Sequence, residues 1–293
     1  MNQVLSFGIN VATSVTPRTD PVSAALVAEE LGFDFVSASD HPSGSNPTYE
    51  VWTMLTWIAA ATSRISVASR VLSLPFRSPA LVAKMAESLD RLSQGRLILG
   101  LGAGAADDEL RGFGLPIPSP QTKIDGLEDA MKIIKGVWTE SEFSHEGSVH
   151  HTKGAILEPK PHRPIPIWLG TFGNRALALT GRHADGWIPS LGYAPYDELS
   201  TMREKVLVAA QSVGRSTSDI ICALNVEIGL NTRDDPSTER ICGPLSMVGD
   251  RLHDLVTKGF TTFNFMPIDA NFDKDIERIA TELLPLLRRI EVI

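Results

Sequence analysis

The sequence predicts an α/β fold, a (β/α)8 TIM barrel, and three observations lead to it. Apolar stretches of strand length alternate with amphipathic stretches of helix length, which is typical of a parallel sheet with helices on its faces. This unit recurs eight times without a break in composition, which favours a closed barrel over an open, doubly wound sheet. A length of 293 residues, 43% of them hydrophobic, suits one barrel domain over 1–293 with insertions.

The expected elements follow one another in a regular order. Strands are predicted over residues 4–11, 33–40, 65–72, 96–104, 165–171, 184–190, 219–230 and 261–268. Helices are predicted over residues 20–32, 48–62, 78–95, 122–138, 173–183, 196–214, 246–259 and 273–290. The first helix has clear boundary signals, because Asp20 can cap it, Pro21 suits its first position and Gly32 suits its end.

Residues 139–165 do not follow this order. Their sequence indicates a short hairpin that turns at Glu146 and Gly147, followed by a stretch interrupted by prolines. We therefore expect an insertion between the fourth helix and the fifth strand. It would lie over one mouth of the barrel and would not form a separate domain.

Composition and motif searches exclude several classes of protein. A net charge of -8 argues against a general nucleic-acid binder, which needs a basic face. No stretch approaches the roughly 20 apolar residues of a membrane span, and no signal peptide is recognisable, so we expect a cytoplasmic protein. Cys222 and Cys242 are too few for a disulfide framework. The histidines have no metal-ligand spacing and no G-x-S-x-G motif occurs, so neither a metal site nor a serine hydrolase is expected.

An acid and an imidazole stand side by side after an apolar stretch. Asp40 and His41 lie at the carboxyl end of the second predicted strand, the end at which barrel enzymes place their active sites. Neighbouring strand residues point to opposite faces, so both side chains project the same way only if the strand has ended, which Pro42 favours. Two interpretations stay open, a functional pair or a polar cap on the strand end.

Two segments rich in glycine follow other predicted strands. "GLGAGAA" (100–106) matches a dinucleotide-binding pattern weakly, but a loop is expected after it, and Asp125 lies within a predicted helix. Glycines at a strand end instead let something flat approach the backbone. "GTFGNRA" (170–176) leads into a helix beginning near Asn174, whose free N–H groups would suit an anion; an ordinary turn is the alternative.

Three segments carry a family resemblance. They are "FVSASDHP" (35–42), "SRVLSLPFRSPALVAKMAESLDRLSQGRLILGLGAG" (69–104) and "PKPHRPIPIWLGTFGNRALALTGRHADGWIP" (159–189). In this order they resemble the bacterial luciferase-like flavin and deazaflavin oxidoreductases, and the resemblance covers nearly the whole chain.

The resemblance implies a tricyclic cofactor across the carboxyl ends of the strands, and it implies a role for each candidate residue. A cis peptide would press Ser69, Arg70 and Val71 against the central ring, and Gly102, Ala103 and Gly104 would let the ring lie close to the fourth strand. Gly170, Thr171, Gly173 and Asn174 would hold the cofactor phosphate. His41 would face the reactive edge and exchange a proton with the substrate, and Asp40 would orient it.

The Asp-His pair and the loose phosphate loop are more similar to the coenzyme F420 branch than to the FMN branch. We therefore expect an oxidoreductase that transfers hydride between F420 and a small organic substrate, and that forms a homodimer. An FMN-dependent monooxygenase that uses O2, a non-catalytic flavin-binding protein and a barrel enzyme without a redox cofactor are the alternatives.

The chain departs from the sugar-phosphate dehydrogenases of the F420 branch at two places. It has Ser43 to Ser45 where they have an aromatic residue, and Ala105 where they have a glutamate. The substrate of those dehydrogenases is therefore not carried over. Asp108 and Glu109 either replace the missing acid or line a solvated loop.

Overall fold

The computed structural model of the chain describes residues 4–17, 19–231, 237–268 and 272–290. Their contacts divide the chain into two compact units. Unit 1 contains Met1–Val11, Asp20–Ser37 and Gly170–Ile293, and unit 2 contains Ala12–Thr19 and Ala38–Leu169. Each unit is described by itself.

Unit 1 consists of parallel strands and the helices that follow them. Its strands are β1 (Ser6–Asn10), β2 (Phe35–Ala38, the last residue of which falls in unit 2), β9 (Gly186–Trp187), β10 (Ile221–Leu230), β11 (Ile241–Gly243) and β12 (Thr262–Pro267). Its helices are α1 (Pro21–Glu30), α6 (Asn174–His183), α7 (Leu199–Gln211), α8 (Leu245–Thr257), α9 (Phe272–Arg278) and α10 (Leu284–Leu287), with the short 3-10 helices η2 (Tyr196–Glu198) and η3 (Thr217–Asp219) and the π-helix η4 (Ile279–Leu283).

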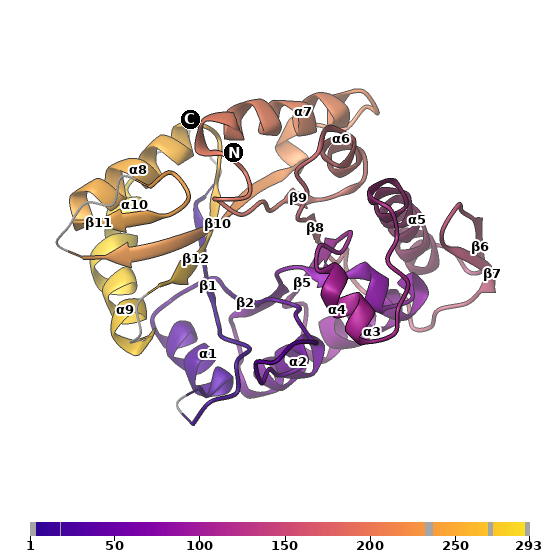
Figure 1. Cartoon of the computed structure of the whole chain (residues 1–293), viewed down its shortest axis with the longest axis horizontal. Helices are drawn as coiled ribbons and strands as arrows, with labels where there is room; N and C mark the ends of the chain where they lie inside the picture. Colours follow the sequence, from indigo (N-terminus) through magenta and orange to yellow (C-terminus); the bar gives the residue numbers. More distant parts are fainter. Residues whose placement is uncertain (1–3, 18, 232–236, 269–271, 291–293) are drawn as a thin grey trace. The chain divides into compact units, whose positions relative to one another are not determined.

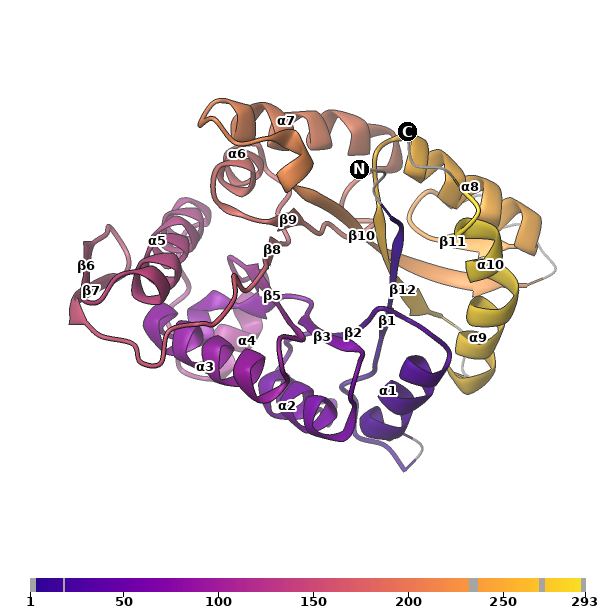
Figure 2. The same ribbon diagram turned by 180° about the vertical axis from the view of Figure 1, so that it is seen from behind.

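The unit 1 strands pair in the order β2-β1-β12-β10, and β9 and β11 also pair with β10. One face of this sheet is apolar, because the buried rings of Phe7, Phe263 and Phe265 stack with centroids 6.1 to 6.4 Å apart. Helices α8, α9 and α10 lie along one side of β10, β12 and β1 (Figures 1 and 2). The other face carries the side chains of Ser37, Asn225 and Asn264 together with the buried ring of Phe35, which packs against Gly8.

Unit 2 alternates strands and helices in the same way. Its strands are β3 (Ser66–Ser69), β4 (Leu72–Ser73), β5 (Leu97–Gly102), β6 (Phe143–Glu146), β7 (His151–Ala155) and β8 (Ile167–Leu169). Its helices are α2 (Val51–Ala61), α3 (Pro79–Leu92), α4 (Asp107–Gly112) and α5 (Pro120–Thr139), with a short turn η1 (Leu74–Phe76). Strand β5 pairs in parallel with β3, β4 and β8.

Several local predictions are confirmed. The Asp20 side chain accepts hydrogen bonds from the N–H groups of Val22 and Ser23 at the start of α1, at 3.0 and 3.1 Å. Strands β6 and β7 form an antiparallel hairpin beyond α5 in which Glu146 pairs with His151, as the turn predicted at Glu146 required. The helices that the structure describes include none long and apolar enough to cross a membrane.

Other local predictions need correction. The single strand expected over 65–72 is divided into β3 and β4, and the peptide between Arg70 and Val71, which lies between them, is cis. The loop expected after the glycines contains helix α4, whose acidic first turn suits a helix N-terminus. Strand β11 was not expected, and the last predicted helix is divided into α9, η4 and α10.

Gly100 in β5 is a position of close packing. The Ser69 hydroxyl donates a hydrogen bond to the Gly100 carbonyl (2.8 Å) and accepts one from the Gly100 N–H (2.9 Å). A Cβ atom at Gly100 would overlap the Ser69 carbonyl oxygen, which is a backbone atom and cannot easily move. The close approach of the end of β3 therefore requires glycine at this position.

Replacing Gly100 with alanine should lower the free energy of unfolding by about 1–3 kcal/mol, because the added methyl group overpacks the site. Gly249→Ala is the matched control, since a Cβ there meets nothing within 4 Å. That control should raise the free energy of unfolding by about 0.4–1 kcal/mol. Urea denaturation measures both, and equal effects would contradict this explanation of Gly100.

Candidate active site

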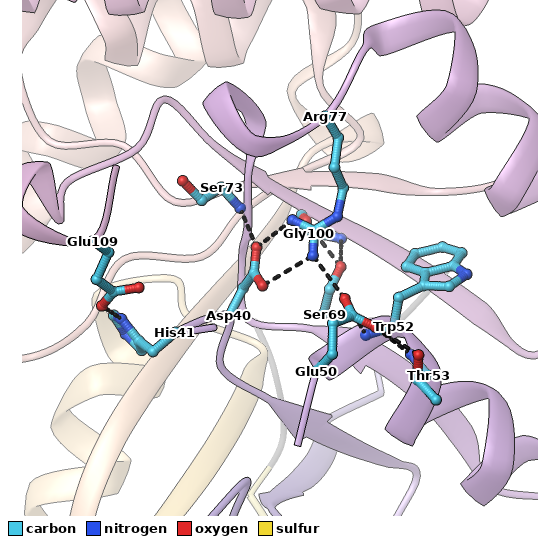
Figure 3. Close-up of polar contacts among 10 residues, drawn as sticks. All are labelled: Asp40, His41, Glu50, Trp52, Thr53, Ser69, Ser73, Arg77, Gly100 and Glu109. Carbon is cyan, nitrogen blue, oxygen red and sulfur yellow. Dashed lines mark hydrogen bonds and ion pairs between the residues drawn. The ribbon is translucent and has the colours of Figure 1, made fainter. Parts of the chain in front are cut away.

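Asp40 is a buried anchor just beyond the end of β2. Its side chain is 0% exposed, and its carboxylate accepts two hydrogen bonds from the Arg77 guanidinium, at 2.6 and 3.1 Å (Figure 3). It also accepts one from the N–H of Ser73, at 2.8 Å. Asp40 therefore ties the end of β2 to β4 and to the segment after η1.

Arg77 extends this network to helix α2. Its Nη2 atom also donates to Glu50 Oε1 at 2.8 Å, and Glu50 caps α2 by accepting from the N–H groups of Trp52 and Thr53. Burial would raise the pKa of Glu50, but the hydrogen bonds from Thr53, Trp52 and Arg77 hold it below its ordinary value. Burial would lower the pKa of Arg77, but the hydrogen bonds and negative charges of Asp40 and Glu50 outweigh burial and raise that pKa above its ordinary value.

The prediction that Asp40 orients His41 is wrong. Both oxygens of Asp40 are occupied by Arg77 and Ser73, while the side chain of His41 is 60% exposed. Strand β2 ends at Ala38, so strand alternation no longer governs the two residues, and their side chains separate (Figure 3). Asp40 stabilises the fold at this point, and His41 remains available to other groups.

His41 instead pairs with Glu109 of α4, whose Oε1 atom lies 2.7 Å from His41 Nδ1. The Glu109 side chain is 16% exposed, and its Oε2 atom is buried with no hydrogen-bond partner among the described residues. With Glu109 ionised, Nδ1–H donates to it, and Nε2 then carries the lone pair that can accept a proton. Of the two acids left open above, Glu109 is the one that pairs with His41, and Asp108 pairs with Arg111.

The predicted cofactor residues of unit 2 lie near the Asp40–Arg77 network and the His41–Glu109 pair. The cis peptide implied near Ser69, Arg70 and Val71 is present between Arg70 and Val71. The Ser69 hydroxyl is hydrogen bonded to both the N–H and the carbonyl of Gly100.

The glycines after β5 have an explanation within the chain itself. A Cβ at Gly102 would lie 2.7 Å from Val71 Cγ2, and Gly104 has a φ of +86°, a backbone conformation that favours glycine. The group that approaches the backbone of Gly102 is therefore the chain's own segment after the cis peptide. A contact of Gly102, Ala103 and Gly104 with a cofactor remains a prediction.

The predicted phosphate loop lies in unit 1. Helix α6 begins at Asn174, as expected, and Gly173 occupies the N-cap position without a side-chain cap. A Cβ at Gly173 would meet nothing within 4 Å. Thr171 is buried, its hydroxyl is hydrogen bonded to that of Thr180 at 2.7 Å, and its carbonyl accepts from Trp187 Nε1 at 2.9 Å, so a ligand would be bound by its backbone N–H.

Three residues of these sites were missed from the sequence. Arg77 and Glu50 hold the buried network, and Lys205 of α7 donates to Asn174 Oδ1 at 2.8 Å beside the start of α6. Glu50 had a local signal, since an acid directly before an apolar helix is a capping residue. Arg77 and Lys205 had none, because their partners are 37 and 31 positions away.

A family model described as luciferase-like monooxygenase matches residues 5–241. The chain belongs to this family. It is 29% identical, over 94% of its length and 87% of the relative, to an F420-dependent glucose-6-phosphate dehydrogenase of Microbacterium testaceum. It is 31% identical, over 78% of its length and 69% of the relative, to one of Kineococcus radiotolerans.

A solved structure confirms the fold of this chain. An F420-dependent secondary alcohol dehydrogenase, solved with an F420-acetone adduct, superposes with a TM-score of 0.87 at 17% identity, over 97% of this chain and 99% of the other. The (β/α)8 barrel predicted from the sequence is thus the fold of this chain, and the resemblance noted above is confirmed. The chain is an enzyme of an oxidoreductase family.

Replacing Arg77 with alanine should lower the free energy of unfolding by about 3–5 kcal/mol, because it leaves the buried carboxylate of Asp40 without its counter-charge. Glu50→Ala is the control within the same network, and it should cost only the cap of α2, about 0.5–2 kcal/mol. Denaturant unfolding of both variants measures the difference. If Arg77→Ala costs no more than Glu50→Ala, Asp40 is not the anchor of this region.

Proposed function

We propose that this chain is an oxidoreductase that transfers hydride between coenzyme F420 and a small organic substrate. The observation that carries the proposal is the exposed imidazole of His41, paired at 2.7 Å with Glu109, beyond the carboxyl end of β2. Relatives over most of the chain that are named as F420-dependent dehydrogenases support the choice of cofactor.

The residues present fit the anionic part of such a cofactor. Helix α6 begins after Gly173 without a side-chain cap, a Cβ at Gly173 would meet nothing within 4 Å, and the Lys205 ammonium group donates to Asn174 at this helix start. A helix N-terminus with an adjacent cation favours a phosphate. Gly170, Thr171, Gly173 and Asn174 would therefore bind the phosphate group, chiefly through backbone N–H groups.

The bound deazaflavin would supply or take up the hydride. His41 would take the hydroxyl proton of an alcohol at Nε2 as hydride leaves carbon, and return it in the reverse reaction. Glu109 would hold the Nδ1–H tautomer and stabilise the imidazolium that forms. The exposed position of His41 leaves Nε2 open to substrate, and the Asp40 network keeps the backbone under it in place.

The second candidate is an FMN-dependent monooxygenase, which the description of the family model favours. It would consume O2 during turnover, whereas the F420 enzyme would not. We further propose a cytoplasmic homodimer; the exposed side chains of Trp57 on α2 and Leu81 on α3, at 71% and 55% exposure, support self-association.

Replacing Gly173 with glutamate should weaken F420 binding by at least about tenfold, because a carboxylate would compete with the phosphate at the start of α6. Gly173→Ala should leave the affinity within a few-fold, since the added methyl group has open space. Fluorescence titration with F420, and in parallel with FMN, measures both variants and the native protein. Tight binding of FMN without F420 would reject the proposed cofactor, and unchanged affinity in folded Gly173→Glu would reject the phosphate site.

His41→Ala should lower turnover by about 10²–10⁴-fold, the usual contribution of a general acid–base group, with cofactor affinity within a few-fold. Glu109→Gln should lower it by about 10–100-fold, as loss of an orienting partner does. Asp108→Asn, an exposed acid on the same helix, is the control and should keep full activity. Full turnover by His41→Ala would leave His41 as a surface residue only.

A further inference from the structure

One face of the unit 1 sheet carries buried polar side chains, beside the ring of Phe35, that the proposed function has not used. Residues in register on neighbouring parallel strands share a face, and Asn264 of β12 is in register with Asn225 of β10. The Ser37 hydroxyl donates to Asn264 Oδ1 at 2.9 Å, and Asn264 Nδ2 donates to Asn225 Oδ1 at 2.8 Å. We call this the polar face of unit 1.

The hydrogen bonds on this face run in one direction. Asn225 Nδ2 donates in turn to the Ser190 hydroxyl oxygen at 3.1 Å. Ser37, Asn225 and Asn264 are at most 2% exposed, so their polar atoms depend on one another for partners. The chain of bonds ends at Ser190, which is partly exposed and whose own proton has no acceptor recorded within the described part of the chain.

Glu227 lies on the same face, two residues beyond Asn225 along β10. Two residues of a strand span about 7 Å, and alternation places both side chains on one side. Glu227 is exposed, although its neighbours Val226 and Ile228 are 0% and 1% exposed. Its carboxylate has no hydrogen bond or ion pair recorded with any residue that the structure describes. An open carboxylate near the carboxyl end of a barrel strand is in the position of a functional residue.

The strands of the unit 1 sheet carry negative charge only. The strands β1, β2, β9, β10, β11 and β12 contain neither lysine nor arginine, and Glu227 is the single charged residue in these segments. A phosphate or carboxylate brought to Glu227 would meet a like charge. The cations near this end of β10 lie outside the strands, at Arg240 directly before β11 and at Arg278, which donates to the Leu230 carbonyl. The Glu227 carboxylate would repel an anionic ligand group and would attract a hydroxyl group as a hydrogen-bond donor, so it can distinguish the two.

We propose that the substrate presents an uncharged hydroxyl group to the polar face, where Glu227 accepts its hydrogen bond, and that anionic substrates such as sugar phosphates are rejected there. This inference rests on the proposed function and specifies its substrate class. It separates the chain from the glucose-6-phosphate dehydrogenases to which it is similar in sequence.

The test uses the cofactor-loaded protein and matched pairs of compounds, each an uncharged sugar or polyol with its own phosphate ester. Native protein should show kcat/KM at least about tenfold higher for the uncharged member. Glu227→Gln should raise KM for that member by about tenfold or more, because it loses a charge-assisted hydrogen bond, with F420 affinity unchanged. Glu227→Lys should move the preference towards the ester. Glu204→Gln, an exposed acid on α7, should change neither constant.

A preference of the native protein for the esters, or an unchanged KM in Glu227→Gln, overturns the inference. So does a panel in which no uncharged hydroxyl compound is turned over or raises the melting temperature of the loaded protein. Cofactor titration separates this outcome from failure of the proposed function. If FMN binds and F420 does not, the hydride-transfer proposal fails, and the same pairs tested on the FMN-loaded protein still decide the role of Glu227.

Discussion

The buried ion pair between Asp40 and Arg77 is the interaction on which the site in unit 2 depends. One carboxylate, 0% exposed, accepts from a guanidinium group and from the Ser73 N–H, and the same guanidinium reaches the N-cap of α2 through Glu50. Separating a buried charge from its partner costs several kcal/mol. The end of β2, the end of β4 and the start of α2 are therefore held together, and the backbone that carries His41 is fixed on one side.

Two neighbours in sequence consequently have opposite roles. The Asp40 side chain is buried, and its carboxylate is hydrogen bonded to Arg77 and Ser73. The His41 side chain is exposed and pairs with Glu109, which is 68 positions away in the sequence. The cis peptide between Arg70 and Val71 has a similar dependence on distant residues, because Gly100 and Gly102 leave room for the segment that contains it. The position of His41 thus depends on residues from several separate segments of the chain.

Unit 1 contains two electrostatic environments that suit different ligands. The start of α6 has no side-chain cap and lies beside Lys205, and a helix N-terminus and a cation both favour an anion. The polar face of the sheet combines buried amides with the carboxylate of Glu227 and has no cation in its strands. Within one unit, an anionic cofactor group and an uncharged substrate group would therefore be drawn to different places.

Local sequence signals were enough to predict the strand–helix alternation, the Asp20 cap, the turn at Glu146 and the start of α6 at Asn174. The cis peptide followed from family resemblance. Three features became known only from the folded chain: Asp40 pairs with Arg77, Glu109 pairs with His41, and Glu227 shares a face with Asn225. Caps and turns depend on residues within a few positions, so they can be recognised locally. Which acid pairs with which base depends on burial and on contacts between distant segments, and these exist only once the chain has folded.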